Sequence, residues 1–114
     1  MMKAITKIVF LNENDEKFFG EGPLRLLRTI EKTGSLRSAS MSMGMAYTKA
    51  LKLVENAEKT LGFKLLQRTT GGKSGGGSQL TPEGKEWITK YEKYRDACKA
   101  VNARLYLEFF SEQQ

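Results

Sequence analysis

A mainly helical α+β fold is predicted by three features of this 114-residue chain. Apolar side chains recur at helical spacing over most of its length. Short stretches rich in β-branched and aromatic residues, at the start and in the middle, predict a few strands. A run of glycines interrupts the middle stretch. The length suits one modest core, so residues 1–114 are interpreted as a single domain.

The first element expected is an N-terminal β-hairpin over residues 3–20. Residues 3–11 (KAITKIVFL) predict a strand, because they combine β-branched and aromatic types. Residues 12–15 carry turn-forming types, and residues 17–20 predict a short returning strand. Two strands alone are marginally stable, so we expect this hairpin to pack on another element.

A first helix is expected after the hairpin, as the first of three over residues 22–61. Gly22-Pro23 opens it, because proline suits the first helical position. Gly34 ends it, since glycine tolerates the left-handed conformation of a helix C-terminus. The apolar side chains at helical spacing between these ends are Leu24, Leu26, Leu27 and Ile30.

A short helix, a turn and a longer helix follow. Ser35 can cap the short helix, over residues 36–42. Gly44 lies in the turn, where we expect a positive φ. The third helix is expected from about residue 46 to residue 61. Its predicted buried stripe is Ala46, Ala50, Leu53, Val54, Ala57 and Leu61.

A glycine-rich β-wing is expected over residues 63–80. Residues 63–70 and 78–80 predict two strands, and five glycines occur among residues 71–77 between them. The order helix, short helix, glycine turn, helix, strand, glycine loop, strand is that of a winged helix-turn-helix. That fold presents one helix to the major groove of DNA.

A long final helix is expected over residues 82–112, because Thr81-Pro82-Glu83 combines an N-cap, a proline at the first position and an acidic first turn. Its apolar residues follow a heptad-like spacing that favours a homodimer interface. The alternative is that this stripe packs on the chain's own N-terminal hairpin. The interface residues predicted are Trp87, Tyr91, Tyr94, Cys98, Val101 and Leu105.

The positive charge is concentrated in the middle of the chain. The net charge is +6, and residues 35–80 carry seven Lys or Arg against two Glu. Such a block is either a solvated face or a phosphate-facing surface, and the expected fold favours double-stranded DNA as the partner. The predicted DNA-binding residues are Ser35, Arg37, Tyr47, Thr48, Lys49, Lys52, Arg68, Lys73 and Ser74.

Composition argues against several other classes. With no histidine there is no imidazole base or histidine metal ligand, and the single cysteine, Cys98, makes no intrachain disulfide. We therefore expect no enzyme activity, no metal and no cofactor. No signal peptide or membrane helix is evident, so a cytoplasmic, nucleoid-associated location without membrane contact is expected.

Residues 61–84 (LGFKLLQRTTGGKSGGGSQLTPEG), together with Gly22-Pro23 and Gly34-Ser35, resemble the N-terminal DNA-binding domain of ModE-type molybdate-responsive regulators within the LysR-like winged-helix group. The resemblance covers roughly residues 18–95 and implies a homodimeric transcriptional regulator. It places the recognition helix at residues 45–61 and the wing at residues 68–79. Molybdate binding is not expected, because the family's oxyanion-binding region lies C-terminal to this segment.

The resemblance has departures. Ser40 replaces the second alanine of the short helix, and Ala46, Thr48 and Lys49 stand where the family has serine and two arginines. Leu51 stands where the family often has tryptophan. Lysine lacks the bidentate fork of arginine. The predicted function is sequence-specific DNA binding by a homodimer. The alternative is a non-catalytic protein-interaction or dimerisation module with vestigial DNA binding.

Overall fold

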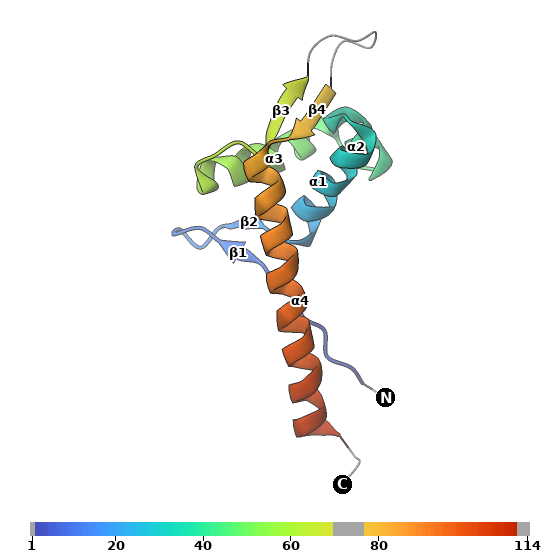
Figure 1. The fold of residues 1–114 in the computed structure, drawn as a ribbon, viewed down its shortest axis with the longest axis vertical. Coiled ribbons are helices and arrows are strands. Elements are labelled where there is room, and N and C mark those ends of the chain that lie inside the picture. Colours follow the sequence, from blue (N-terminus) through green and yellow to red (C-terminus); the bar gives the residue numbers. More distant parts are fainter. Residues whose placement is uncertain (1, 70–76, 112–114) are drawn as a thin grey trace.

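The computed structural model describes residues 2–69 and 77–111. A helical body carries a β-hairpin on one side and a second two-stranded sheet at one end, and a long helix runs from the body (Figure 1). The elements in chain order are β1 (Phe10–Leu11), β2 (Lys17–Phe19), α1 (Glu21–Thr33), α2 (Leu36–Ser42), α3 (Tyr47–Leu61), β3 (Leu66–Thr69), β4 (Gly77–Leu80) and α4 (Pro82–Phe110). This mainly helical winged helix-turn-helix confirms the predicted fold class.

The N-terminal hairpin is smaller than expected. The strand predicted over residues 3–11 is regular only at Phe10–Leu11, which pairs antiparallel with β2. Residues 2–9 instead lie beside α4 (Figure 1). The Ile8 carbonyl accepts a hydrogen bond from the Tyr91 hydroxyl at 2.7 Å, and the Thr6 hydroxyl accepts one from the Asn102 amide, also at 2.7 Å. Strand propensity needs a partner strand to become a ladder, and this segment contacts a helix.

The three-helix body begins one residue earlier than expected. α1 starts at Glu21, so Pro23 is its third residue. Gly34 and Gly62 end α1 and α3 in the left-handed conformation, with φ of 77° and 84°. The Ser35 hydroxyl caps α2 by accepting from the Ser38 amide at 3.0 Å.

The body closes over one apolar core. The buried apolar side chains come from every element except β1 and β3, with Leu65 adding one from the loop before β3. α3 contributes Ala50, Val54 and Ala57, while Leu53 and Leu61 are half-buried. Ala46 was expected in this stripe but is exposed, because it precedes the first turn of α3 as its N-cap.

The wing is joined to the body at the start of β4. β3 and β4 pair antiparallel, with Arg68 opposite Ser78. The Ser78 amide donates to the Gly34 carbonyl at 2.9 Å, which ties the wing to the turn between α1 and α2. A Cβ atom at Gly77 would collide with that same carbonyl oxygen, so the close approach requires glycine. β3 is also shorter than the predicted strand over residues 63–70.

α4 starts as expected. The Thr81 hydroxyl accepts from the Gly84 amide at 2.9 Å and donates to the Lys64 carbonyl at 2.6 Å, which ties the helix start to the wing. Its first half packs on the body, and its second half extends away from it beside the N-terminal segment (Figure 1). The molecule therefore measures 64 × 30 × 24 Å.

Candidate nucleic-acid interface

The helix-turn-helix is built by α2, the turn over residues 43–46, and α3. Gly44 has a φ of 65°, as predicted for the turn. Ala39 is fully buried in α2, which lets the neighbouring helix approach closely. Ser40, which replaces a typical alanine, is also buried, and its hydroxyl donates to the Arg37 carbonyl at 2.8 Å. A buried hydroxyl with a partner costs little, so this departure is compatible with the packing.

α3 presents a polar row on its outer face. Thr48, Lys52, Glu55 and Lys59 follow each other at helical spacing, and all of them are exposed. Lys49 is exposed beside the row. Hydroxyl and ammonium groups on such a face can bond to base edges or phosphates. The structure thus places the predicted Thr48, Lys49 and Lys52 on one continuous surface of α3, where they line a shallow depression.

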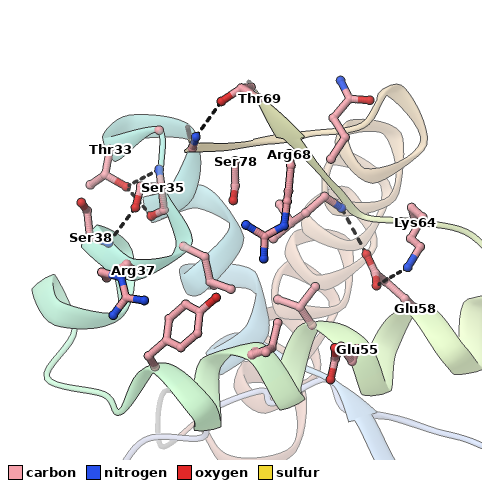
Figure 2. A pocket seen from close by; sticks show the side chains of 18 residues that line it. Thr33, Ser35, Arg37, Ser38, Glu55, Glu58, Lys64, Arg68, Thr69 and Ser78 are labelled. Atoms are coloured by element: carbon pink, nitrogen blue, oxygen red, sulfur yellow. Dashed lines mark hydrogen bonds and ion pairs between the residues drawn. The ribbon is translucent and has the colours of Figure 1, made fainter. Parts of the chain in front are cut away.

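A second part of the predicted site lies on the other side of α3. Ser35, Arg37, Tyr47 and Arg68 line a hollow of about 980 Å³ between α2, α3 and the wing. Figure 2 shows Arg68 pointing from β3 into this hollow, with Arg37 across from it. The Arg37 guanidinium lies over the Tyr47 ring, 4.5 Å from its centroid. This cation–π contact joins α2 to α3 and leaves the guanidinium at the rim.

Glu58 holds the wing against α3. Its Oε2 accepts hydrogen bonds from the Leu65 and Leu66 amides at 2.8 and 3.2 Å, and its Oε1 lies 3.7 Å from Lys64 Nζ (Figure 2). The carboxylate thereby orders the chain just before β3. Because Arg68 follows two residues after Leu66, Glu58 also positions the arginine that enters the hollow.

The sequence prediction missed two residues of this surface. Glu55 and Lys59 extend the row of Thr48 and Lys52 by two further helical turns. The i, i+4, i+7, i+11 spacing from Thr48 was the signal that could have identified them. Glu55 also lines the hollow, so a carboxylate lies at the centre of an otherwise basic face. Lys73 and Ser74, the remaining predicted DNA-binding residues, lie outside the described residues.

The predicted dimer stripe of α4 divides into two environments. Tyr91 is 1% exposed, and its ring packs 5.0 Å from Phe19 and 5.7 Å from Phe10, centroid to centroid. Burial raises the pKa of the Tyr91 hydroxyl, which also lies near the Glu21 carboxylate. Trp87 belongs to the same aromatic cluster and meets Phe19 edge to face, with ring centroids 5.4 Å apart. For these two residues the structure favours the alternative reading, in which the stripe packs on the chain's own hairpin.

The rest of the stripe is more exposed, although the Tyr94 ring still lies 6.0 Å from Phe10, centroid to centroid. Tyr94, Val101 and Leu105 are 52, 44 and 38% exposed, and Cys98 is half-buried. Phe109 continues the same face and is 74% exposed. Two apolar side chains of the N-terminal segment, Ile5 and Val9, are exposed as well. Exposed apolar side chains at helical spacing along α4 make this face a candidate protein interface.

Other sites are not evident among residues 2–69 and 77–111. No group of three His, Cys, Asp or Glu side chains is placed to hold a metal ion in that part of the chain. Within the same residues, no helix has the length and hydropathy needed to cross a membrane.

Comparisons with known proteins agree with the geometry. Residues 23–85 match the family described as "Bacterial regulatory helix-turn-helix protein, lysR family". The chain is 30% identical over 109 residues to "Molybdenum transport protein ModE" of Herbaspirillum seropedicae, covering 96% of this chain and 36% of that protein. It is 35% identical over 91 residues to "Transcriptional regulator ModE" of Haemophilus influenzae, covering 80% of this chain and 36% of that protein.

A further relative is named for DNA binding. The chain is 32% identical over 69 residues to "DNA-binding transcriptional dual regulator ModE" of Escherichia coli, covering 60% of this chain and 26% of that protein. The resemblance inferred from residues 61–84 is thus confirmed. The first of these relatives is named as a molybdenum transport protein and the other two as transcriptional regulators. The chain spans about a third of the length of the first relatives it matches.

Proposed function

Since the chain belongs to the LysR family of bacterial regulatory helix-turn-helix proteins, we propose that it regulates transcription by binding specific DNA sequences as a homodimer. The observation that carries this proposal is the outer face of α3, where Thr48, Lys49 and Lys52 are all exposed. A helix held in this way can enter the major groove with its N-terminal residues toward the base edges. Because such a regulator must reach bacterial chromosomal DNA, we propose that the protein is cytoplasmic and associated with the nucleoid.

The hollow beside α3 suits the DNA backbone. Arg37 and Arg68 line it from opposite sides. In this arrangement the two arginines pair with phosphates that flank the groove occupied by α3. The wing then touches the adjacent backbone or minor groove. The sequence discrimination would come from Thr48, Lys49 and Lys52, and the general affinity from the arginines and the wing.

The dimer is proposed through the outer half of α4. Tyr94, Val101 and Leu105 give an apolar face, and a second copy is the partner because regulators with one recognition helix read two-fold repeats. The two α3 helices would then enter successive major grooves, about 34–36 Å apart.

Salt dependence and point variants test this proposal. In mobility-shift titrations over a salt series, log affinity should fall linearly with log salt concentration, because phosphate contacts release counterions. Arg68→Ala should weaken binding to all duplexes alike. Thr48→Ala should change the ranking among duplexes selected from a random pool. Lys99→Ala, an exposed lysine on α4, is the matched control and should change neither. Affinity insensitive to salt would contradict the phosphate contacts.

One observation favours a second candidate. Glu55 lies between Lys52 and Lys59 on the outer face of α3, and a carboxylate there repels phosphate. A protein-interaction module with vestigial DNA binding would tolerate it. Failure of the dimer to enrich any sequence from a random duplex pool would favour this module.

A further inference from the structure

Two ion pairs join α1 to α4, and in one the arginine lies on α1 while in the other it lies on α4. Arg28 of α1 donates from Nε to Oε2 of Glu92 at 3.1 Å and from Nη2 to the other carboxylate oxygen. Arg95 of α4 donates from Nη1 to both carboxylate oxygens of Glu21, each at 3.1 Å. Arg28 meets Glu92 with two nitrogens on two oxygens, a forked geometry that fixes direction as well as distance. We call these four residues the α1–α4 clamp.

The clamp lies where α4 leaves the body. Before it, α4 is held by burial, with Ile88 and Tyr91 in the core. Beyond Arg95, Asn102 and Tyr106 bond to the N-terminal segment instead. Among the described residues, the clamp is therefore the last set of ion pairs between α4 and α1, the helix on which α2 and α3 pack.

Each pair joins one exposed side chain, Arg28 at 38% or Glu21 at 46%, to a more shielded one. The Arg95 side chain is 18% exposed and the Glu92 side chain 27%. Hydrogen bonding to Arg28 lowers the pKa of Glu92 below its usual range, and the charge of Arg95 acts in the same direction. Arg28 also bonds to Glu31 at 2.7 Å and Arg95 to Asp96 at 3.0 Å, so each guanidinium is held from two sides.

We infer that the α1–α4 clamp sets the spacing between DNA half-sites that the homodimer accepts, a role that rests on the function proposed above. If two copies join through the outer half of α4, the angle between α4 and each body fixes the distance and rotation between the two α3 helices. One base pair added between half-sites moves them by about 3.4 Å and turns them by about 35°. A dimer in which α4 is held rigidly against each body distinguishes operators that differ by one base pair in spacing. A dimer in which α4 moves freely against the body does not. Arg28, Glu92, Arg95 and Glu21 are thus positioning residues that touch no base.

Selection from a random pool of 40-base-pair duplexes tests this inference. The full chain is expected to enrich an inverted repeat with one preferred spacing. Arg28→Gln, Glu92→Gln and the double variant should enrich the same half-site, with the preference for that spacing over its neighbours reduced by about fivefold, the equivalent of an ion pair of this kind. Affinity for a duplex with a single half-site should not change.

Matched controls remove the same charges from the same helices. Arg25→Gln on α1 and Glu86→Gln on α4 change exposed residues for which the described structure shows no ion pair. Both should keep the spacing preference of the original chain. Arg28→Lys keeps the positive charge but loses the two-pronged hydrogen bond to the carboxylate. It should therefore weaken the spacing preference less than Arg28→Gln does. This variant also tests the inference if Arg28→Gln folds poorly.

The outcomes separate the two proposals. If the original chain enriches a repeat and the clamp variants keep its spacing preference at full sharpness, the inference is overturned and the proposed function stands. If the original chain enriches no repeat at all, the proposed function is contradicted and the inference falls with it. A loss of single half-site affinity in the clamp variants would also overturn the inference, because the clamp would then act on the reading surface itself.

Discussion

The two halves of α4 carry the same spacing of apolar residues in opposite surroundings. In the first half, Trp87 and Tyr91 pack against Phe10 and Phe19 of the hairpin. In the second half, Val101 and Leu105 face solvent beside a segment that covers only one side of the helix. A heptad-like stripe therefore predicts that one face of a helix is buried, but it does not predict which element or chain covers that face. Here the chain itself covers the first half and leaves the second half exposed.

The largest expected effect is in the first half. Tyr91→Ala should lower the free energy of unfolding by about 3–5 kcal/mol, because it opens a cavity in the aromatic cluster and removes the bond to the Ile8 carbonyl. Tyr94→Ala, one turn further and 52% exposed, should cost much less. Urea unfolding of both variants at two protein concentrations separates this effect from dimerisation. Equal losses would contradict the division of α4 into two halves.

Negative charge introduced into the second half of α4 should weaken the proposed dimer without unfolding the chain. Val101→Asp with Leu105→Asp should weaken self-association by at least tenfold, since two carboxylates would be buried in the proposed interface. Ala103→Asp, two residues after Val101 and thus on the opposite side of the helix, is the control. Sedimentation velocity measures the association, and circular dichroism the helix content. A double variant that associates as tightly as the original chain would place the interface elsewhere.

A smaller effect is expected from pH at the junction between the halves. The pKa of Glu92 is lowered mainly by its hydrogen bonds to Arg28, while burial opposes the shift. Its charged form stabilises the fold above its ordinary pKa of 4.5, and this contribution is lost as the pH falls through the lowered value.

Glu92→Gln should therefore be less stable than the original chain by about 1 kcal/mol at pH 7, with the gap closing below pH 4.5. Glu86→Gln should show no such pH-dependent gap. Thermal unfolding at several pH values measures both, and a gap that persists at low pH would contradict the ionic account.

An effect of similar size, confined to one segment, is expected for the N-terminal residues beside the second half. Asn102→Ala removes the bond to the Thr6 hydroxyl, which should cost about 1 kcal/mol. Trypsin should then cut after Lys3 and Lys7 about fivefold faster, because the segment detaches more often. Asn56→Ala, which removes a bond from α3 to the Lys17 carbonyl, should leave that cleavage unchanged. Unchanged cleavage in Asn102→Ala would mean that other contacts hold the segment.

Local chemistry made much of this fold predictable. Ser35 and Thr81 cap helices as expected, and Gly34, Gly44 and Gly62 take the positive φ that a helix end or tight turn favours. These features depend on neighbouring residues alone. The strand expected over residues 3–11 was mostly wrong, because pairing depends on a partner that sequence does not name.

The candidate DNA-binding surface was predictable in part. Helical spacing identified Thr48, Lys49 and Lys52, whose exposure the structure bears out, but their contacts with DNA stay a prediction. Glu55 was missed because positive charge was the criterion for DNA-binding residues, and a carboxylate does not meet it. The α1–α4 clamp could not be predicted from the sequence either, because Arg28 and Glu92 are 64 residues apart and meet only in the folded chain.

The most direct test of the central claim is hydroxyl-radical footprinting on a duplex enriched from the random pool. Two α3 helices joined through α4 should protect two backbone patches whose centres lie about 10 base pairs apart, on one face of the duplex. Val101→Asp with Leu105→Asp should reduce them to one weak patch. A single patch with the unaltered chain, or protection unaffected by Thr48→Ala and Arg68→Ala, would contradict the account.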